Sequence, residues 1–200
     1  MRNVLVGNII SNLHKTVAIL VIGIVSLSAC AQFADKPTPP TRTFKTIDLL
    51  ISIEDMPPNW EVSSGPVKVK NYRPLYPNDA SIIVFNVIGD DSDRKGASYI
   101  TYMFADEESA KWRYERFVMR SPEDEPVEWS FQSEIADHSF FDCNEYGGEL
   151  PSIICKWAAR YEEFIVEFLV QMNPDHISLN EVEKIVIRID EIMGVHLNLP

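Results

Sequence analysis

Short clusters of polar residues in this chain contain the residue types of metal sites and of catalytic sites. The acidic run Asp90-Asp91-Ser92-Asp93-Arg94-Lys95-Gly96 has three carboxylates ahead of a glycine, as calcium-binding loops do. If Asp91 is the first ligand of an EF-hand loop, Lys95 takes the fifth position and Tyr102 the twelfth, where a bidentate glutamate is required. The spacing therefore predicts a solvated loop and no metal site.

A second cluster, Asp137-His138-Ser139, contains the residue types of a hydrolytic triad. Neighbouring residues of an extended segment point to opposite sides, so these three side chains cannot pass a proton in line. His176 and His196 are far apart in the sequence, without the spacing of a metal-binding pair. We therefore expect no catalytic residue, no metal and no cofactor. The alternative is a hydrolase whose site combines distant residues, such as His138 or His176 with a carboxylate.

A third cluster, Leu27-Ser28-Ala29-Cys30, follows the apolar run 16–29 and the basic residue Lys15. This arrangement resembles the leader and lipobox of bacterial lipoprotein precursors. The resemblance implies a signal peptide over 1–29, lipidation of Cys30 with palmitate-type chains, and anchoring in the cell membrane or outer membrane, facing the periplasm or the exterior. The apolar run is shorter than the roughly 20 residues of a spanning helix. The alternative is an uncleaved anchor over 4–25, which would have to bury Lys15.

Export would also decide the state of the other two cysteines, Cys143 and Cys155. An oxidising compartment would allow them to form a disulfide that closes a loop of 13 residues. Such a loop stabilises a fold by roughly 3 kcal/mol in the chain-entropy model. The alternative is a pair of buried free thiols.

The charge of the chain limits its partners. Cleavage before Cys30 would leave 171 residues and, because the leader contains Arg2 and Lys15 but no acid, would change the net charge from −12 to −14. A surface this acidic repels phosphate backbones, so we expect no nucleic acid partner. The membrane would be reached through the lipid on Cys30, and the remaining partner would be an unknown protein or small-molecule ligand.

The rest of the chain predicts one domain behind a tether. Residues 30–45 would form the lipidated cysteine and a proline-rich tether, and 46–200 a single α+β domain. A short helix is expected over 46–56, and the segments expected to be extended are 60–70, 82–88, 99–104, 129–135, 153–161 and 164–172. The turn at Glu162-Glu163 has poor turn chemistry, so its register is not predicted.

Two further helices have clear signals. Asp106 is expected to cap a helix over 107–119, with Ala110, Tyr114, Phe117 and Val118 on one apolar stripe. The run Ser178-Leu-Asn-Glu181 reads as a capping box for the last helix. Its apolar stripe extends from Leu179 to Met193, and Gly194 is expected at its C-cap.

The order of these elements predicts an antiparallel sheet of about five or six strands packed by two or three helices. The pattern from Leu49-Leu50 to Pro57-Pro58-Asn59-Trp60, with the late cysteine pair, is similar to exported sensor-type domains of actinobacterial kinases and related lipoproteins. This similarity implies no particular functional residue.

Aromatic residues are the last candidates for a site. Trp60, Trp129, Trp157 and the pair Phe140-Phe141 could line a carbohydrate or lipid pocket, or could fill the core. Trp112 lies off the apolar stripe of its helix, so we expect it to be partly exposed on a contact surface. Together these observations favour a membrane-tethered exported lipoprotein that binds a ligand or partner in the cell envelope. An envelope hydrolase and a structural envelope component are the alternatives.

Overall fold

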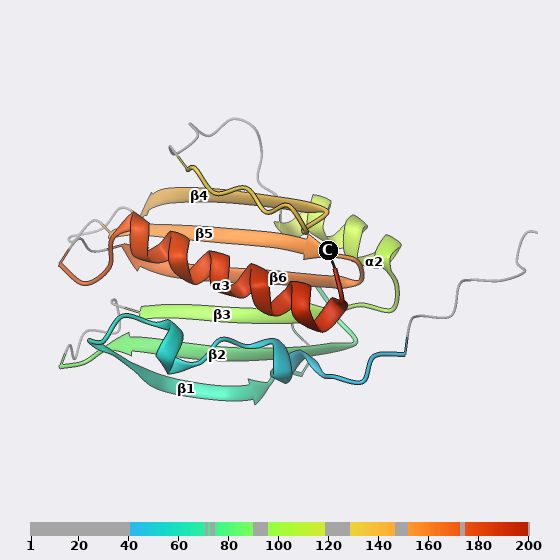
Figure 1. The fold of residues 1–200 in the computed structure, drawn as a ribbon, viewed down its shortest axis with the longest axis horizontal. Coiled ribbons are helices and arrows are strands. Elements are labelled where there is room, and N and C mark those ends of the chain that lie inside the picture. Colours follow the sequence, from blue (N-terminus) through green and yellow to red (C-terminus); the bar gives the residue numbers. More distant parts are fainter. Residues whose placement is uncertain are drawn as a thin grey trace, which may run out of the picture. The chain divides into compact units, whose positions relative to one another are not determined.

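The computed structural model describes residues 41–70, 72, 75–89, 96–118, 129–146, 152–172 and 175–199. They form one domain around a six-stranded antiparallel sheet with the order β1-β2-β3-β6-β5-β4 (Figure 1). The α+β class and the single antiparallel sheet are therefore as predicted. The lipobox with Cys30 and the acidic run 90–95 lie outside the described residues. No helix in the described ranges is long and apolar enough to cross a membrane.

The strands follow the apolar segments of the sequence closely. They are β1 (Trp60–Lys68), β2 (Asp79–Val87), β3 (Gly96–Met103), β4 (His138–Tyr146), β5 (Ser152–Tyr161) and β6 (Phe164–Met172). The segments expected to be extended over 82–88 and 99–104 lie in β2 and β3, which are antiparallel neighbours. The prediction of a strand over 129–135 is wrong, because strand structure begins only at His138.

The turn between β5 and β6 determines the register of the hairpin. Tyr161 pairs with Phe164, which leaves Glu162 and Glu163 as a two-residue turn. Glu162 adopts a left-handed conformation with φ of 49°, a region that non-glycine residues rarely enter. The N–H of Glu162 donates a 2.8 Å hydrogen bond to Asp137, and Arg42 forms ion pairs with both glutamates. Partners from distant segments thus stabilise a turn that its own sequence does not favour.

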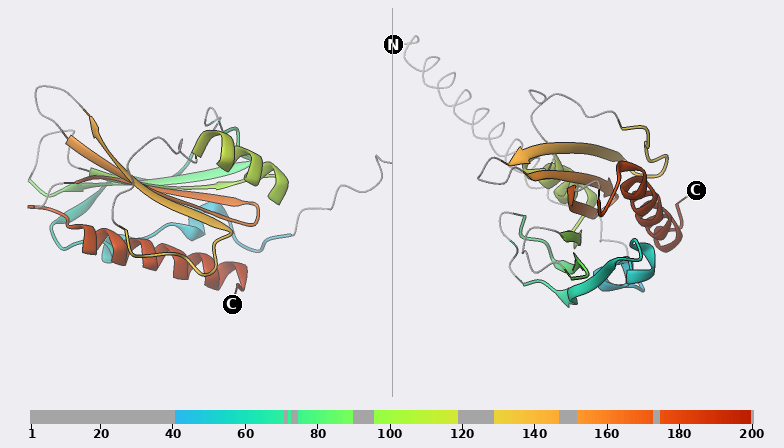
Figure 2. Two further views of the ribbon diagram at one scale, coloured as in Figure 1. Left: turned by 90° about the horizontal axis from the view of Figure 1, so that it is seen from above. Right: turned by 90° about the vertical axis from the view of Figure 1, so that its left-hand side faces the viewer.

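Helices lie on opposite faces of the sheet, with α3 (Leu179–Leu197) on one face and α2 (Glu107–Arg113) on the other (Figure 2). Under α3, the aromatic residues Phe85, Tyr99 and Trp157 are buried with the apolar stripe of the helix. Under α2, a smaller core forms around Tyr102 and Ile165. Both faces of the central strands are therefore apolar, which explains their continuous rather than alternating hydrophobic pattern.

The helix expected over 107–119 begins as predicted and then changes its winding. The side chain of Asp106 accepts a hydrogen bond from the N–H of Ser109, which confirms the N-cap. Residues Tyr114–Val118 form a π-helical turn (η4). Tyr114 and Val118 stay buried, but Phe117, expected in the same stripe, is 39 % exposed. The wider turn rotates Phe117 away from the sheet, so the 3.6-residue period failed at this position.

The last helix has the expected start but a later end. Ser178 and Glu181 exchange the hydrogen bonds of a capping box, as predicted. The stripe is buried from Val182 to Met193 except for the half-buried Ile192, whereas its expected first member, Leu179, is exposed. Gly194 is not the cap, because α3 continues to Leu197 and Asn198 provides the left-handed cap with φ of 54°.

Instead of one helix, the segment 46–56 forms two short 3₁₀ turns, η2 (Thr46–Leu49) and η3 (Ile53–Asp55). The carboxylates of Asp48 and Asp55 accept hydrogen bonds from the backbone N–H groups of Lys45 and Ser52. Such local bonds compete with continuous helix. Leu49 and Ile51, two residues apart, are both buried, a spacing that a helix would not produce.

The residues just before these turns contact the domain. Arg42 binds the β5–β6 turn, and the ring of Phe44 stacks on Phe164 with 5.8 Å between centroids. The end of the segment expected to be a tether, at 41–45, is therefore in contact with the sheet.

Candidate ligand-binding pocket

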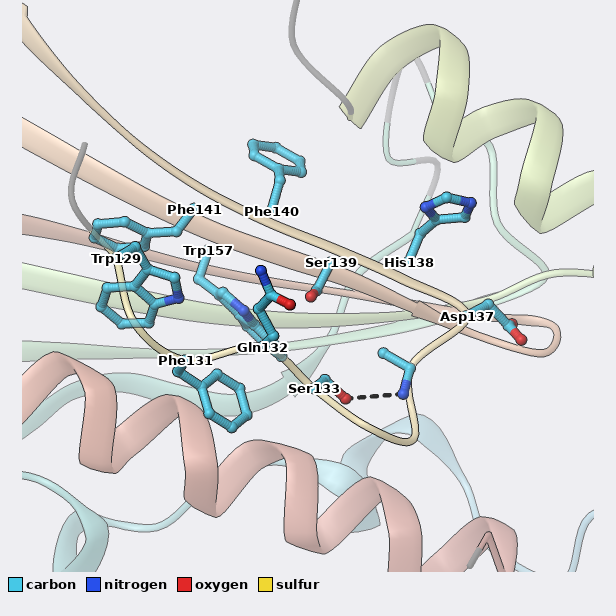
Figure 3. A pocket seen from close by; sticks show the side chains of 11 residues that line it. Trp129, Phe131, Gln132, Ser133, Asp137, His138, Ser139, Phe140, Phe141 and Trp157 are labelled. Atoms are coloured by element: carbon cyan, nitrogen blue, oxygen red, sulfur yellow. Dashed lines mark hydrogen bonds between the residues drawn. The ribbon is translucent and has the colours of Figure 1, made fainter. Parts of the chain in front are cut away.

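A hollow with aromatic residues in its lining lies along β4, one of the two edge strands of the sheet, and is the clearest candidate site (Figure 3). Its volume is about 420 Å³. One wall is the 129–137 segment, which runs between β4 and α3, and the other is β4 itself. The residues that line it are Trp129, Phe131, Gln132, Ser133, Ala136, Asp137, His138, Ser139, Phe140, Phe141 and Trp157.

Stacked aromatic rings form part of the lining of the hollow. The rings of Trp129 and Phe141 stack face to face, with centroids 3.9 Å apart and an interplanar angle of 16°. Both are half-buried, whereas Trp157 is buried beneath them. Gln132 and Ser139 add an amide and a hydroxyl to this lining. The hollow thus presents hydrogen-bonding groups beside partly exposed aromatic faces. In small-ligand sites such polar groups set the orientation of the ligand.

Two serines attach the 129–137 segment to α3. Ser130 donates a 2.6 Å hydrogen bond to Glu183, and Ser133 donates a 2.6 Å bond to Asp190. The two acceptors lie seven residues apart, or about two helical turns, and therefore face the same side of α3. The segment thus runs along the helix without any strand or helix structure of its own.

The same segment is also fixed internally. The Ser133 hydroxyl accepts hydrogen bonds from the N–H groups of Ile135 and Ala136. Its bond to Ala136 is drawn in Figure 3. Ile135 lies against Gly194, where an added Cβ atom would be 2.8 Å from the Ile135 side chain. The glycine that was expected to end α3 instead allows this close approach.

Tyr161 connects this attachment to the buried core. Its hydroxyl donates a 2.5 Å hydrogen bond to the same Asp190 oxygen that Ser133 binds. Burial, with the neighbouring Asp190 carboxylate, holds the pKa of Tyr161 well above its ordinary value. Tyr161 therefore acts as a hydrogen-bond donor that keeps Asp190 in place behind the pocket wall.

The structure separates the three residues that resembled a triad. Asp137 is engaged in the fold, because it accepts the N–H of Glu162 and forms a 3.0 Å ion pair with Arg160. His138 points to the α2 side of the sheet, near the ring of Tyr114 (Figure 3). Ser139 points to the opposite side, with the 129–137 segment. This alternation along β4 is what the sequence predicted.

Other residues of interest lie away from the pocket. Cys143 and Cys155 form the expected disulfide, which joins directly paired residues of β4 and β5. His176 lies where its carbonyl accepts the indole N–H of Trp60, and His196 contacts Phe44. Within the described ranges, no three His, Cys, Asp or Glu side chains converge as metal ligands would.

Trp112 is 47 % exposed, as its place off the apolar stripe predicted. It contacts Phe117 edge to face and lies beside Arg113 and Arg116, whose guanidinium carbons are 4.6 and 5.3 Å from its ring centroid. The structure therefore places an aromatic and arginine cluster on α2 and η4, on the other face of the sheet from α3. Its role as a contact surface stays a prediction.

Sequence reasoning found the aromatic residues of the pocket but not the pocket itself. Of the expected set, Trp129, Trp157 and Phe141 come together, whereas Trp60 is part of the core. Phe140 lies on the border of the hollow, and its ring points to the other face of β4, against Tyr114. Phe131, Gln132 and Ser133 were not recognised, because the segment was expected to be a strand.

Comparisons of this chain with known proteins gave no matching family model, no similar curated protein and no similar solved structure. The site is therefore interpreted from its geometry alone.

Proposed function

We propose that this protein is a lipid-anchored, exported binding protein of the cell envelope and that the hollow beside β4 is its binding site. The observation that carries the binding part of the proposal is the half-buried stack of Trp129 on Phe141. Trp129 belongs to the 129–137 segment, which Ser130 and Ser133 attach to α3. A large stacked surface kept partly open costs hydrophobic free energy that full burial would recover. Such a surface is well suited to a ligand with a flat apolar face.

A binding role is also supported by how the polar groups near the hollow are used. Ser133 and Asp137 are hydrogen-bonded to α3 and to the β5–β6 turn, and His138 lies on the other side of β4 from Ser139. A hydrolytic site would instead require a nucleophile within hydrogen-bond reach of its base. These groups hold the shape of the hollow.

The anchoring part of the proposal rests on the leader and on Leu27-Ser28-Ala29-Cys30. Mass spectrometry of the membrane fraction would test it, and we expect a mature chain that begins at a diacylated Cys30. Cys30→Ala should leave an unprocessed precursor without lipid. A wild-type chain that keeps Met1 would contradict the anchor and the export that it implies.

Binding in the hollow can be tested with a library of aromatic and sugar-like fragments, screened against the full-length chain by ligand-observed NMR. We expect a set of fragments whose signals are lost with Trp129→Ala. Trp112→Ala is the control, because it removes another solvent-accessible tryptophan, on the other face of the sheet. If no fragment binds, or if Trp129→Ala changes nothing, the hollow is not a ligand site.

A further inference from the structure

The two edges of the sheet differ in how far they are protected from pairing with another strand. β1 forms one edge, and its register with β2 shifts twice, between Val62 and Ser64 and between Ser64 and Val67. It also contains Pro66, which has no N–H to donate, and ends at Lys68. Bulges, proline and lysine are the usual devices that prevent an edge strand from adding a neighbour.

β4 forms the opposite edge and has none of these devices. It pairs with β5 without a register shift from His138 to Tyr146, and its sequence His-Ser-Phe-Phe-Asp-Cys-Asn-Glu-Tyr lacks proline and lysine. The disulfide between Cys143 and Cys155 further joins it to β5. A long, regular edge with two phenylalanines is a template for strand pairing.

The pairing pattern shows which backbone groups of β4 face outward. Tyr161 and Phe164 flank a two-residue turn and therefore form a hydrogen-bonded pair across the hairpin. Because the direction of the backbone groups alternates along a strand, every second residue of β5 from Tyr161 back to Cys155 also directs its N–H and C=O groups toward β6. Cys155 therefore cannot share a hydrogen-bonded pair with Cys143. Their Cα–Cα distance of 4.0 Å agrees, because non-hydrogen-bonded pairs are the closer ones.

It follows that Ser139, Phe141 and Cys143 direct their N–H and C=O groups away from β5, toward the outer side of β4. The bond from the N–H of Asp137 to the carbonyl of Arg160 fits this alternation, because it shows that the backbone carbonyl of Arg160 faces the β4 side of β5. No backbone group of another described residue bonds to these outward groups.

The outward backbone groups and the hollow belong to the same residues. Ser139 and Phe141 both line the hollow with their side chains. In an antiparallel or parallel pair, residues directly opposite each other point to the same face. A strand added along β4 would therefore direct the side chain opposite Phe141 or Ser139 toward Trp129, while its backbone meets the outward groups.

Charge decides which kind of strand would bind. The chain has a net charge of −12, and a second hollow of about 710 Å³ on the other side of the 129–137 segment is lined by Glu134, Glu183, Asp190 and Glu191. Two copies of so acidic a chain would repel each other, whereas an extended segment with basic residues would be attracted.

We propose that β4 binds an extended, basic segment of a partner polypeptide as an additional strand, with one apolar side chain seated in the hollow against Trp129 and Phe141. This inference rests on the proposed binding function and specifies its ligand. Backbone hydrogen bonds would supply affinity for any extended chain, and the aromatic hollow would select the residue seated in it.

The test uses a random peptide library displayed on phage and selected on the full-length chain. We expect enriched peptides that alternate apolar and basic residues. Ser139→Pro should weaken their binding at least about tenfold, because it removes an outward N–H that β5 does not use. Ser139→Ala is the matched control, since it removes the hydroxyl and keeps the N–H. Edge strands tolerate proline, so the variant is expected to fold.

A measurement on the peptide avoids any dependence on how the variant folds. Two versions of an enriched peptide would be made, one N-methylated on its odd-numbered residues and one on its even-numbered residues. One version should lose binding and the other should keep it, because only one set of N–H groups faces β4. The proposal is overturned if no peptide is enriched, if both methylated versions bind equally, or if the chain dimerises through β4 and Ser139→Pro makes it monomeric. Fragments that bind in a Trp129-dependent way would still support the binding site in each of these cases.

Discussion

Ser133 of the 129–137 segment and Asp190 of α3 are joined by a 2.6 Å hydrogen bond, and this bond keeps one wall of the candidate pocket in place. Asp190 also accepts the Tyr161 hydroxyl. The Asp190 carboxylate therefore links this wall directly to a buried tyrosine of the sheet.

Ser133→Ala should lower the free energy of unfolding by about 1–3 kcal/mol, because it removes a bond to a charged acceptor and leaves the N–H groups of Ile135 and Ala136 without their acceptor. Ser130→Ala is the control. Its hydroxyl binds Glu183 at an exposed position, so we expect less than about 1 kcal/mol. Urea denaturation of both variants measures the difference, and equal losses would show that the Ser133 attachment has no special role.

The disulfide should matter most for β4, the outermost strand. Because Cys143 and Cys155 close a short loop, reduction should lower the free energy of unfolding by roughly 3 kcal/mol in the chain-entropy model. Urea denaturation with and without dithiothreitol measures this loss. The double variant Cys143→Ala/Cys155→Ala should start from the lower value and should not respond to the reductant. If dithiothreitol also lowered the free energy of unfolding of the double variant, the reductant would be acting at a site other than this disulfide.

Arg42 should stabilise the domain although it lies in the segment expected to be a tether. Its guanidinium binds both carboxylate oxygens of Glu163, at 2.7 and 2.9 Å, and Glu163 is buried. Arg42→Ala should cost about 2–4 kcal/mol, since it leaves a buried carboxylate without its cation. Arg188→Ala is the control, because Arg188 is exposed beside Asp55 and Glu191, and exposed pairs contribute about 0–1 kcal/mol.

The bonds of Arg42 also show that the folded domain begins before residue 46, the boundary expected from the sequence. A chain shortened to begin at residue 46 lacks Arg42 and should lose at least as much stability as Arg42→Ala. Thermal unfolding of the shortened chain beside the full-length chain measures this. Equal midpoints would mean that the contacts of 41–45 do not stabilise the sheet.

The strands and the last helix were predictable because their signals are local. The β-branched run in β2 and the capping box at Ser178 and Glu181 each determine structure within a few residues. An antiparallel sheet packed by helices then follows from the order of the elements.

The pocket was not predictable because distant residues create it. Nothing near Ser130 and Ser133 in the sequence indicates that Glu183 and Asp190 will accept their hydrogen bonds. The turn at Glu162 likewise depends on Asp137 and Arg42, which are remote in the chain. Periodicity failed at Phe117 for a different reason, since a π-helical turn changes the number of residues per turn.

Buried tyrosines should make the protein sensitive to alkaline pH. Burial raises the pKa of Tyr161 above the value of about 10 that a tyrosine has in an unfolded chain, and the Asp190 carboxylate raises it further. Burial also raises the pKa values of Tyr99, Tyr102 and Tyr114. The folded protein therefore keeps these hydroxyls protonated at a pH where the unfolded chain has released their protons.

The sign of the effect follows from this difference. The contribution of Tyr161 to stability is complete below about pH 10 and is lost as the pH rises toward its higher folded-state pKa. In that range each such tyrosine should lower the free energy of unfolding by about 1.4 kcal/mol per pH unit. Tyr161→Phe removes one of them, so its stability should start lower at neutral pH but fall less steeply above pH 10. Urea denaturation at a series of pH values measures both slopes, and parallel curves would mean that Tyr161 titrates alike in the folded and unfolded states, against the burial that the structure shows.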